Sequence, residues 1–262
     1  MCGCLAMIGA AFVVVPPRTN VMLLGVDRAP DETFLGRTDT IILATFQPLK
    51  PYVGMLSIPR DLWVVIPGVG ENRINTAHYF AEGEDPGSGP FATRDTIREN
   101  FGVGVNYFVR IRFSGIKNIV EALGGLDMEF PEQMSGYPAG THHLNGDQVL
   151  AFVRDRSGTD DFFRMAHGQL FLKSFIKQVV QPATWLRLPA VYAAAMRSLD
   201  TNLPIWYWPR LGVTILRVGP DGIDNRVITR EMTDPFMTNE GAQVLGPNWP
   251  AIEPVLVEMF GK

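Results

Sequence analysis

The sequence predicts a mixed α/β fold in which helices cover both faces of a central β-sheet, giving three layers. Short apolar or β-branched runs, typical of strands, dominate the first part of the chain, and segments with helical spacing then alternate with further strands. Residues 47–51, with two prolines, separate two of these runs and predict an antiparallel hairpin. With 262 residues, 46% of them hydrophobic, the chain can bury one sizeable core.

The expected elements follow one another without a repeat or a low-complexity linker. Strands are expected at 21–26, 40–46, 53–58, 62–66, 107–112, 127–130 and 225–230. Helices are expected at 92–101, 114–123, 145–154, 161–180, 184–199 and 251–260. Asn145 and Gln148 form the pattern of a capping box, which places Arg154 at the C-terminal end of its helix. The Pro- and Trp-rich stretch beyond Leu203 is expected to cover the same domain.

The N-terminal segment at 2–15 is uncharged and apolar, and Pro16-Pro17 ends it. Its 14 residues are fewer than the roughly 20 that span a bilayer, and no positive residues precede them as in a signal peptide. We interpret 1–17 as the end of a truncated membrane anchor or signal-like segment and 18–262 as the catalytic domain. A buried N-terminal strand or helix is the alternative. The only cysteines, Cys2 and Cys4, exclude a disulfide framework and a thiolate site in the domain.

The charge balance excludes a nucleic-acid-binding surface built on overall basicity, because the formal net charge is −4. No nucleic-acid partner is expected. Among the 23 cationic residues, 18 are Arg and five are Lys, a bias that suits bidentate binding of phosphate or carboxylate oxygens. A coding bias toward arginine codons is the alternative explanation.

Polar residues stand at the ends of the expected strands. Asp27 follows the first strand, Arg37 and Asp39 precede the second, and Arg60 follows the third. Loops at strand ends of α/β sheets converge on ligand sites, so these carboxylates and guanidiniums could meet in one crevice. Ordinary turns and surface ion pairs would also account for them.

A second cluster contains Arg154, Arg156 and Arg164, with Gln169 further along the next expected helix. Three guanidiniums so close together repel one another unless anions separate them, and a diphosphate is a small polyanion that binds several arginines. Two carboxylates together with phosphate oxygens are also ligands that Mg²⁺ accepts. The two clusters therefore predict a magnesium–diphosphate site, whereas a glycine-rich loop of the P-loop type is absent from the sequence.

Short motifs in a specific order resemble those of the LytR-CpsA-Psr family. They are LLGVD (23–27), GRTDT (36–40), MLSIPRD (55–61), RINTAH (73–78), ALGGLD (122–127), LNGDQVLAFVRDR (144–156), DFFR (161–164) with Gln169, and VLGPNW (244–249). The resemblance covers about residues 20–262, and the joint spacing makes it specific.

The resemblance implies a phosphotransferase at the bacterial cell membrane, anchored by its N-terminal segment, with the catalytic domain on the extracytoplasmic side. Such enzymes move a glycopolymer, for example teichoic acid or capsule polysaccharide, from a polyprenyl-diphosphate carrier onto peptidoglycan, usually with Mg²⁺, for which Mn²⁺ can substitute. Two alternatives stay open: a diphosphatase that uses water as acceptor, and a non-catalytic module that binds polyprenyl-phosphate lipids. A DNA-binding regulator is disfavoured, because the sequence has no basic stripe and no helix-turn-helix pattern.

The family's site residues correspond to positions of the two clusters. Asp27 and Asp39 match its metal-binding and catalytic aspartates, with Arg60 beside them in catalysis. The diphosphate-binding residues match Arg37, Arg60, Arg154, Arg156, Arg164 and Gln169. Both aspartates could bind the metal, or Asp39 could hold it while Asp27 acts as the base.

Three features remain open. His167-Gly168 stands where the family commonly has Arg-Gln. This change is either tolerated drift or a pH-tuned phosphate site in which a nearby dianion raises the pKa of His167. His78, His142 and His143 lack the spacing of a zinc site and are expected to be surface or capping residues. The apolar residues between Ile176 and Met196 are expected to be mostly core, and the resemblance implies a channel for the prenyl chain near them.

Overall fold

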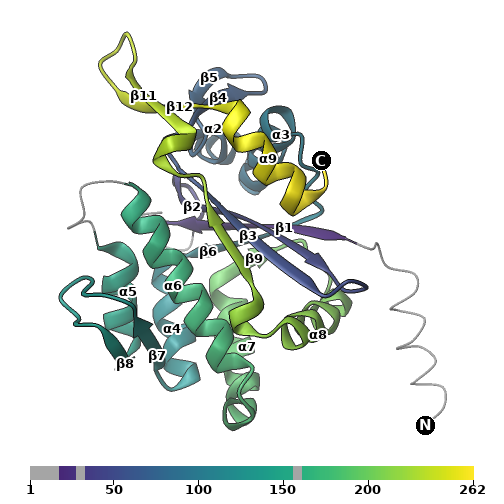
Figure 1. The fold of residues 1–262 in the computed structure, drawn as a ribbon, viewed down its shortest axis with the longest axis vertical. Coiled ribbons are helices and arrows are strands. Elements are labelled where there is room, and N and C mark those ends of the chain that lie inside the picture. The colour runs from purple at the N-terminus through teal and green to yellow at the C-terminus, as the bar shows by residue number, and fades with distance from the viewer. Residues whose placement is uncertain (1–17, 28–32, 156–160) are drawn as a thin grey trace.

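A six-stranded sheet forms the middle layer of the computed structural model, which describes residues 18–27, 33–155 and 161–262 (Figure 1). Its strand order is β10-β3-β2-β1-β6-β9. The strands are β1 (Thr19–Val26), β2 (Thr38–Gln47), β3 (Tyr52–Ile58), β6 (Tyr107–Arg112), β9 (Leu199–Thr201) and β10 (Asp224–Val227). Neighbours β1–β2, β2–β3 and β6–β9 are antiparallel, and β1–β6 and β3–β10 are parallel. The predicted mixed sheet with an antiparallel hairpin is confirmed.

Helices cover both faces of this sheet because alternate strand residues point to opposite sides. Met22 in β1 packs against Phe101 of α3 (Gly89–Phe101) and against α9 (Trp249–Phe260), and α2 (Thr76–Glu84) lies in the same layer (Figure 1). Val21, one residue earlier, lies in the core that Leu211 of α8 (Trp208–Val218) and Leu172 of α6 (Asp161–Val179) share. The three-layer arrangement is therefore as expected.

The layer that contains α6 and α8 has a second core of its own. It is built from α4 (Phe113–Leu123), α5 (Gly146–Arg154), α7 (Leu188–Ser198) and the hairpin of β7 (Leu126–Phe130) and β8 (Gly140–Leu144). The predicted capping box starts α5: the Asn145 side chain accepts the Gln148 N–H, and the Gln148 side chain accepts the Asn145 N–H. This cap fixes where α5 begins and leaves Arg154 as its last residue.

Two further hairpins lie outside the central sheet. The first contains β4 (Trp63–Ile66) and β5 (Gly70–Arg73), and the second contains β11 (Thr233–Met237) and β12 (Gln243–Pro247). A parallel bridge between Leu62 and Leu245 joins them. The expected strand at 62–66 thus exists, but it pairs with β5 and not with the central sheet.

The expected helix at 184–199 is wrong as a single element. A 3₁₀ helix, η1 (Pro182–Arg187), comes first, and α7 begins at Leu188 with Pro189 in its first turn. Proline lacks an N–H and is tolerated only where that N–H has no intrahelical partner, so Pro189 fixes the start of a new helix. A second short 3₁₀ helix, η2 (Ile205–Tyr207), precedes α8 in the stretch expected to be an irregular cover.

The expected anchor at 1–17 lies outside the described residues. Among the helices that are described, none combines the length and the apolar character required to cross a membrane.

Candidate active site

The two predicted aspartates come from neighbouring antiparallel strands. Asp27 directly follows β1, and Asp39 is the second residue of β2. Gly25 pairs with Thr40 and Val26 pairs with Thr38, so Asp39 is the extra residue of a β-bulge. A bulge bends its strand and changes the direction of a side chain, and bulges are frequent beside active sites. The C-terminal end of β1 and the bulge near the start of β2 together bring both carboxylates to the same end of these two strands.

Three arginines from three different elements face these carboxylates. Arg154, at the end of α5, places its Nη2 2.8 Å from Oδ1 of Asp27. Arg60, in the turn after β3, bonds Oδ1 of Asp39 through its Nη1, and Nη1 of Arg164 in the first turn of α6 lies 3.5 Å from the same oxygen. The predicted convergence of residues more than a hundred positions apart is therefore present.

A narrow cleft connects these groups. It is lined by Asp27, Asp39, Thr40, Phe113, Val153, Arg154 and Arg164, and its volume is about 10 Å³. This space accepts about one water molecule or one small ion. Gly25 is required beside the cleft, because a Cβ at this position would lie 2.5 Å from Cε1 of Phe113.

The remaining predicted diphosphate ligands are placed differently. Arg37 is exposed at the residue before β2, and it makes no ion pair with any other part of the chain that the structure describes. Arg156 lies outside the described residues. The amide nitrogen of Gln169 donates to Oγ of Ser57 at 3.0 Å and to the carbonyl of Arg226 at 2.8 Å. Gln169 thus connects α6 to β3 and to the edge strand β10, and its role in binding diphosphate stays a prediction.

The interpretation of His167 as a diphosphate-facing group with a raised pKa is wrong. His167 is fully buried, its Nδ1 lies 3.0 Å from the carbonyl oxygen of Phe152, and its ring stacks on the Phe152 ring at 4.1 Å. Phe163 lies on its other side, also at 4.1 Å. Burial among these rings lowers the pKa of His167, because the charged form loses its hydration. The neighbouring Gly168 has open space where a Cβ would stand.

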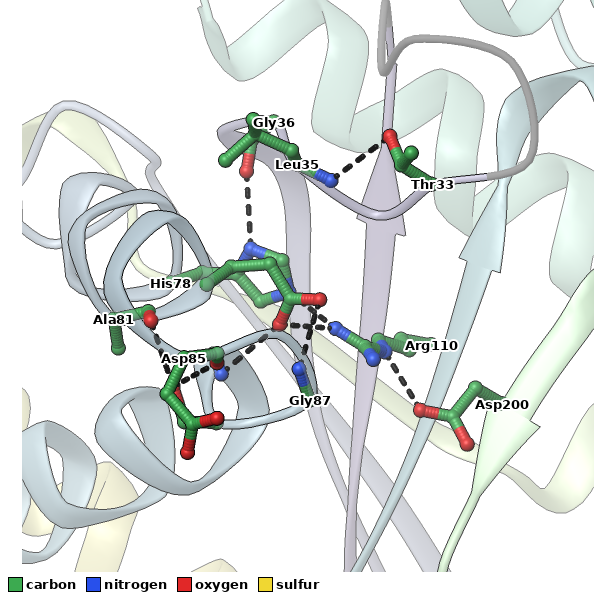
Figure 2. A network of polar contacts seen from close by, with 12 residues as sticks. Thr33, Leu35, Gly36, His78, Ala81, Asp85, Gly87, Arg110 and Asp200 are labelled. Atoms are coloured by element: carbon green, nitrogen blue, oxygen red, sulfur yellow. Dashed lines mark hydrogen bonds and ion pairs between the residues drawn. The ribbon is translucent and has the colours of Figure 1, made fainter.

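A buried polar network that the sequence analysis missed lies next to this site (Figure 2). The guanidinium of Arg110 in β6 donates to Glu82 of α2 at 2.7 Å and to Asp200 of β9 at 2.8 Å, and its Nη1 lies 3.2 Å from Nε2 of His78. Nδ1 of His78 in turn lies 3.0 Å from the carbonyl oxygen of Gly36. The network therefore connects three elements to the backbone just before Arg37 and Asp39.

His78 is neutral in this network and is not the surface or capping residue that was expected. It is fully buried, and burial lowers its pKa to about 4. The neutral ring donates through Nδ1–H to the Gly36 carbonyl and accepts the Arg110 hydrogen bond at Nε2, which assigns its tautomer. A signal was available in the sequence: His78 and Glu82 are four residues apart on α2, and Arg110 interrupts an apolar strand.

The other two histidines lie at the β7–β8 hairpin and are exposed or half-exposed. Nδ1 of His143 is 2.6 Å from Oδ1 of Asp127, and Nε2 of His142 is 3.0 Å from the carbonyl oxygen of Pro138. Both agree with the expected surface position.

The carboxylate oxygens of the cleft suit a hard cation whose coordination sphere the protein fills only in part. The described residues contain no group of three or more His, Cys, Asp or Glu side chains that could enclose a metal ion. Asp27 and Asp39 supply carboxylate oxygens in the same cleft, and Mg²⁺ commonly binds one or two carboxylates together with phosphate oxygens and water. The residues present therefore fit Mg²⁺ or Mn²⁺ bound jointly with a phosphate ligand.

A three-layer α/β/α domain with two carboxylates opposite three arginines at its strand ends belongs to the class that can bind phosphorylated ligands together with a divalent cation. Residues 16–256 match the sequence model of the LytR_cpsA_psr family, so the chain belongs to this family.

Two curated relatives show the similarity in sequence. The polyisoprenyl-teichoic acid–peptidoglycan teichoic acid transferase TagU of Bacillus cereus is 31% identical over 191 residues, which are 70% of this chain and 60% of TagU. The regulatory protein MsrR of Staphylococcus aureus is 27% identical over 195 residues, which are 71% of this chain and 57% of MsrR. The chain thus matches about three-fifths of the length of these relatives.

Solved structures show the same fold. TagV of Bacillus subtilis superimposes with a TM-score of 0.76 at 22% identity, over 94% of this chain and 99% of TagV. A structure of TagT bound to LI-WTA superimposes with a TM-score of 0.72 at 21% identity, over 94% of this chain and 92% of TagT.

Proposed function

We propose that this domain transfers a glycopolymer from a polyprenyl-diphosphate carrier onto peptidoglycan, at the extracytoplasmic side of a bacterial cell membrane. The observation that carries the proposal is the cleft in which Asp27 and Asp39 face Arg154, Arg60 and Arg164. Membership of the family and the similarity to a teichoic acid transferase support the substrate class.

The arginines have the geometry to bind the diphosphate. Arg154 lines the cleft on the side of Asp27, Arg164 lines it on the side of Asp39, and Arg60 also bonds Asp39, so non-bridging oxygens of both phosphates could be held at once. Their positive charges offset the charge that develops on the departing phosphate. Arg37, exposed beside β2, is a further candidate ligand for the lipid-linked substrate.

The reaction requires a base and a balanced exchange of bonds. The acceptor hydroxyl oxygen forms a bond to the sugar-side phosphorus, the bridging oxygen bond to that phosphorus breaks, and polyprenyl phosphate leaves with the bridging oxygen. Asp27 or Asp39 takes the hydroxyl proton, since both carboxylates line the cleft. The aspartate that does not act as the base would hold Mg²⁺ or Mn²⁺, which would supply further positive charge to the diphosphate.

Product analysis tests the proposal. The chain is incubated with a lipid-diphosphate sugar, Mg²⁺ and peptidoglycan fragments, with and without a chelator. We expect a sugar phosphate linked to peptidoglycan, together with polyprenyl monophosphate, and we expect chelation to stop turnover. Asp27→Asn serves as the inactive reference, and Asp234→Asn, on the exposed hairpin β11–β12, is the matched control that should stay active.

Other products would assign another function. Free sugar phosphate without linkage to peptidoglycan identifies a diphosphatase. Binding of the lipid without any product identifies a lipid-binding module. Full turnover in chelator removes the metal from the mechanism.

A further inference from the structure

One region of the surface is unusually apolar. Large apolar side chains project from η1, α7, η2 and α8, which follow one another in the chain. Six of them define what we call the apolar face: Trp185, Leu186, Met196, Ile205, Trp206 and Leu216. Leu186 is 94% exposed and Trp206 is 71% exposed. Trp185, Leu186 and Met196 belong to the segment expected to be mostly core, and for these three residues that expectation is wrong.

The outward sides of both helices continue this face. On α7 the exposed residues Pro189, Tyr192 and Met196 follow helical spacing, and on α8 the exposed residues Val213 and Leu216 do so. A helix on a water-exposed surface normally carries polar residues on its outward side. Contiguous apolar surface of this kind marks a site of interaction.

An aromatic contact joins the two halves of the face. The ring of Tyr192 in α7 meets the ring of Trp208 in α8 edge to face, with centroids 5.8 Å apart. Both helices lie on the same side of the central sheet (Figure 1). The exposed residues of η1 and η2, which directly precede these helices, therefore flank one continuous region.

The charge of this region differs from that of the whole chain. Residues 182–218 contain four arginines and a single acidic residue, Asp200, whereas the whole chain has a net charge of −4. Asp200 is paired with Arg110 of the buried network, and Arg187, Arg197 and Arg217 are exposed. The region also contains three of the five tryptophans. Tryptophan, tyrosine and arginine beside aliphatic side chains are typical of surfaces that insert into the headgroup layer of a bilayer.

The end of α8 lies near the point where the chain enters the sheet. Nη1 of Arg217 in α8 donates to the carbonyl of Pro48 at 2.9 Å, in the turn between β2 and β3. Phe46 at the end of β2 pairs with Thr19, the first residue of β1. The predicted anchor at 2–15 precedes this residue in the chain, so an anchor and the apolar face could reach the same bilayer.

We propose that the apolar face docks onto a bilayer surface that contains anionic lipids. Its aliphatic and indole side chains enter the headgroup layer, and Arg187, Arg197 and Arg217 pair with lipid phosphates. This contact is independent of the chemistry in the cleft, and it orients the domain in addition to any anchor.

Vesicle binding of the full chain tests this inference, because residues 1–17 are then the same in every variant. The vesicles contain phosphatidylcholine alone or with phosphatidylglycerol, and brominated acyl chains report which tryptophans enter the lipid. We expect quenching of tryptophan emission, stronger with phosphatidylglycerol, and loss of most of this quenching in Trp185→Phe/Trp206→Phe. Leu186→Ser/Trp206→Ser should bind about tenfold more weakly or worse.

Two controls separate docking from other effects. Phe236→Ser/Met237→Ser removes exposed apolar side chains from the distant hairpin β11–β12 and should bind as the unchanged protein does. Arg197→Gln should weaken binding to vesicles with phosphatidylglycerol and leave binding to pure phosphatidylcholine unchanged.

The inference is overturned if quenching persists in Trp185→Phe/Trp206→Phe/Trp208→Phe, because only Trp63 and Trp249 of the opposite layer then remain to be quenched. It is equally overturned if the serine variants bind both vesicles normally with unchanged quenching. A lipid-free dimer that dissociates on Leu186→Ser/Trp206→Ser would identify the face as a contact between copies of the chain.

Discussion

The cleft at the ends of β1 and β2 and the network around Arg110 contain the same kinds of side chain, but they hold them differently. In the cleft, the arginine side chains are 12–41% exposed, so the guanidiniums that face the mostly buried carboxylates remain in contact with solvent. In the network, Arg110 and Glu82 are both about 5% exposed, and the guanidinium is bonded to Glu82, Asp200 and His78.

This difference separates a site for a ligand from a structural cluster. Buried charges that bond only one another cannot leave their partners without a large desolvation penalty. The guanidiniums of the cleft keep part of their hydration, so replacing their carboxylate partner by a polyanion costs less than it would in the network. Arginine and carboxylate alone do not indicate catalysis. The exposure of these side chains, and the number of bonds they make within the protein, distinguish a ligand site from a structural cluster.

The largest expected effect is on the reaction and follows Asp39→Asn. We expect turnover to fall by about 10²–10⁴-fold if this carboxylate is the base or holds the metal. The free energy of unfolding should fall by about 1–3 kcal/mol, because asparagine keeps an acceptor for the two arginines but loses the negative charge. Turnover and urea unfolding are measured on the same preparation, with Asp234→Asn as control. Normal turnover in Asp39→Asn would contradict a catalytic role.

For the network around Arg110, we expect a large effect of substitution on stability. Arg110→Leu leaves Glu82 buried without its cation, so the free energy of unfolding should fall by about 3–5 kcal/mol. The double variant Arg110→Leu/Glu82→Leu should recover much of this loss, because it removes both charges. Arg94→Leu, which breaks the half-exposed pair with Asp95, should cost under about 1 kcal/mol. Equal losses in Arg110→Leu and Arg94→Leu would contradict the comparison.

The network also predicts a dependence of stability on pH. The pKa of His78 is lowered to about 4, from a value near 6.5 in the unfolded chain. The unfolded chain binds a proton in this interval and the folded one does not. Stability is therefore fully present above about pH 6.5 and falls, by about 3 kcal/mol, as the pH drops toward 4.

Unfolding by urea at several pH values between 4 and 7 measures this effect. The slope should decrease in His78→Gln and persist in His143→Gln, whose imidazole is exposed on the β7–β8 hairpin. His167 contributes in the same direction, because burial lowers its pKa as well. An unchanged slope in His78→Gln would assign the pH dependence to other groups.

The smallest expected effect concerns the geometry of one arginine in the cleft. Arg60→Lys keeps the charge but loses the planar fork, so affinity for inorganic diphosphate should fall roughly tenfold. Arg94→Lys is the matched control, because Arg94 pairs with Asp95 on α3. Calorimetric titration with inorganic diphosphate measures the affinity of both variants. Unchanged affinity in Arg60→Lys would place Arg60 outside the diphosphate site.

Local patterns were sufficient to predict much of the fold. The apolar runs of β1 and β2 and the capping box at Asn145 are encoded within a few neighbouring residues, and the structure confirms them. Helix α2 was missed because it exposes Tyr79 and contains Gly83, which weaken its periodicity. Helix α8 was missed because its outward side is apolar and its start is rich in Pro and Trp.

The candidate site was predictable in composition but not in arrangement. The strand-end positions of Asp27 and Asp39 and the end position of Arg154 on α5 follow from local sequence. The burial of His78 depends on Arg110, 32 positions away, and that of His167 depends on Phe152 in another helix. Such contacts between distant residues have no signature in the pattern of a single segment.

The bulge at Asp39 makes the spacing of residues in β2 as important as their identity. Deleting Thr38 would let β1 and β2 pair in a regular ladder, with every hydrophobic side chain after the deletion still facing its own layer. Such a protein should fold, and nearly all its contacts would survive, yet the carboxylate would lose the irregular backbone that directs it into the cleft. A shortened strand is thus a way to silence the site without changing a single chemical group in it.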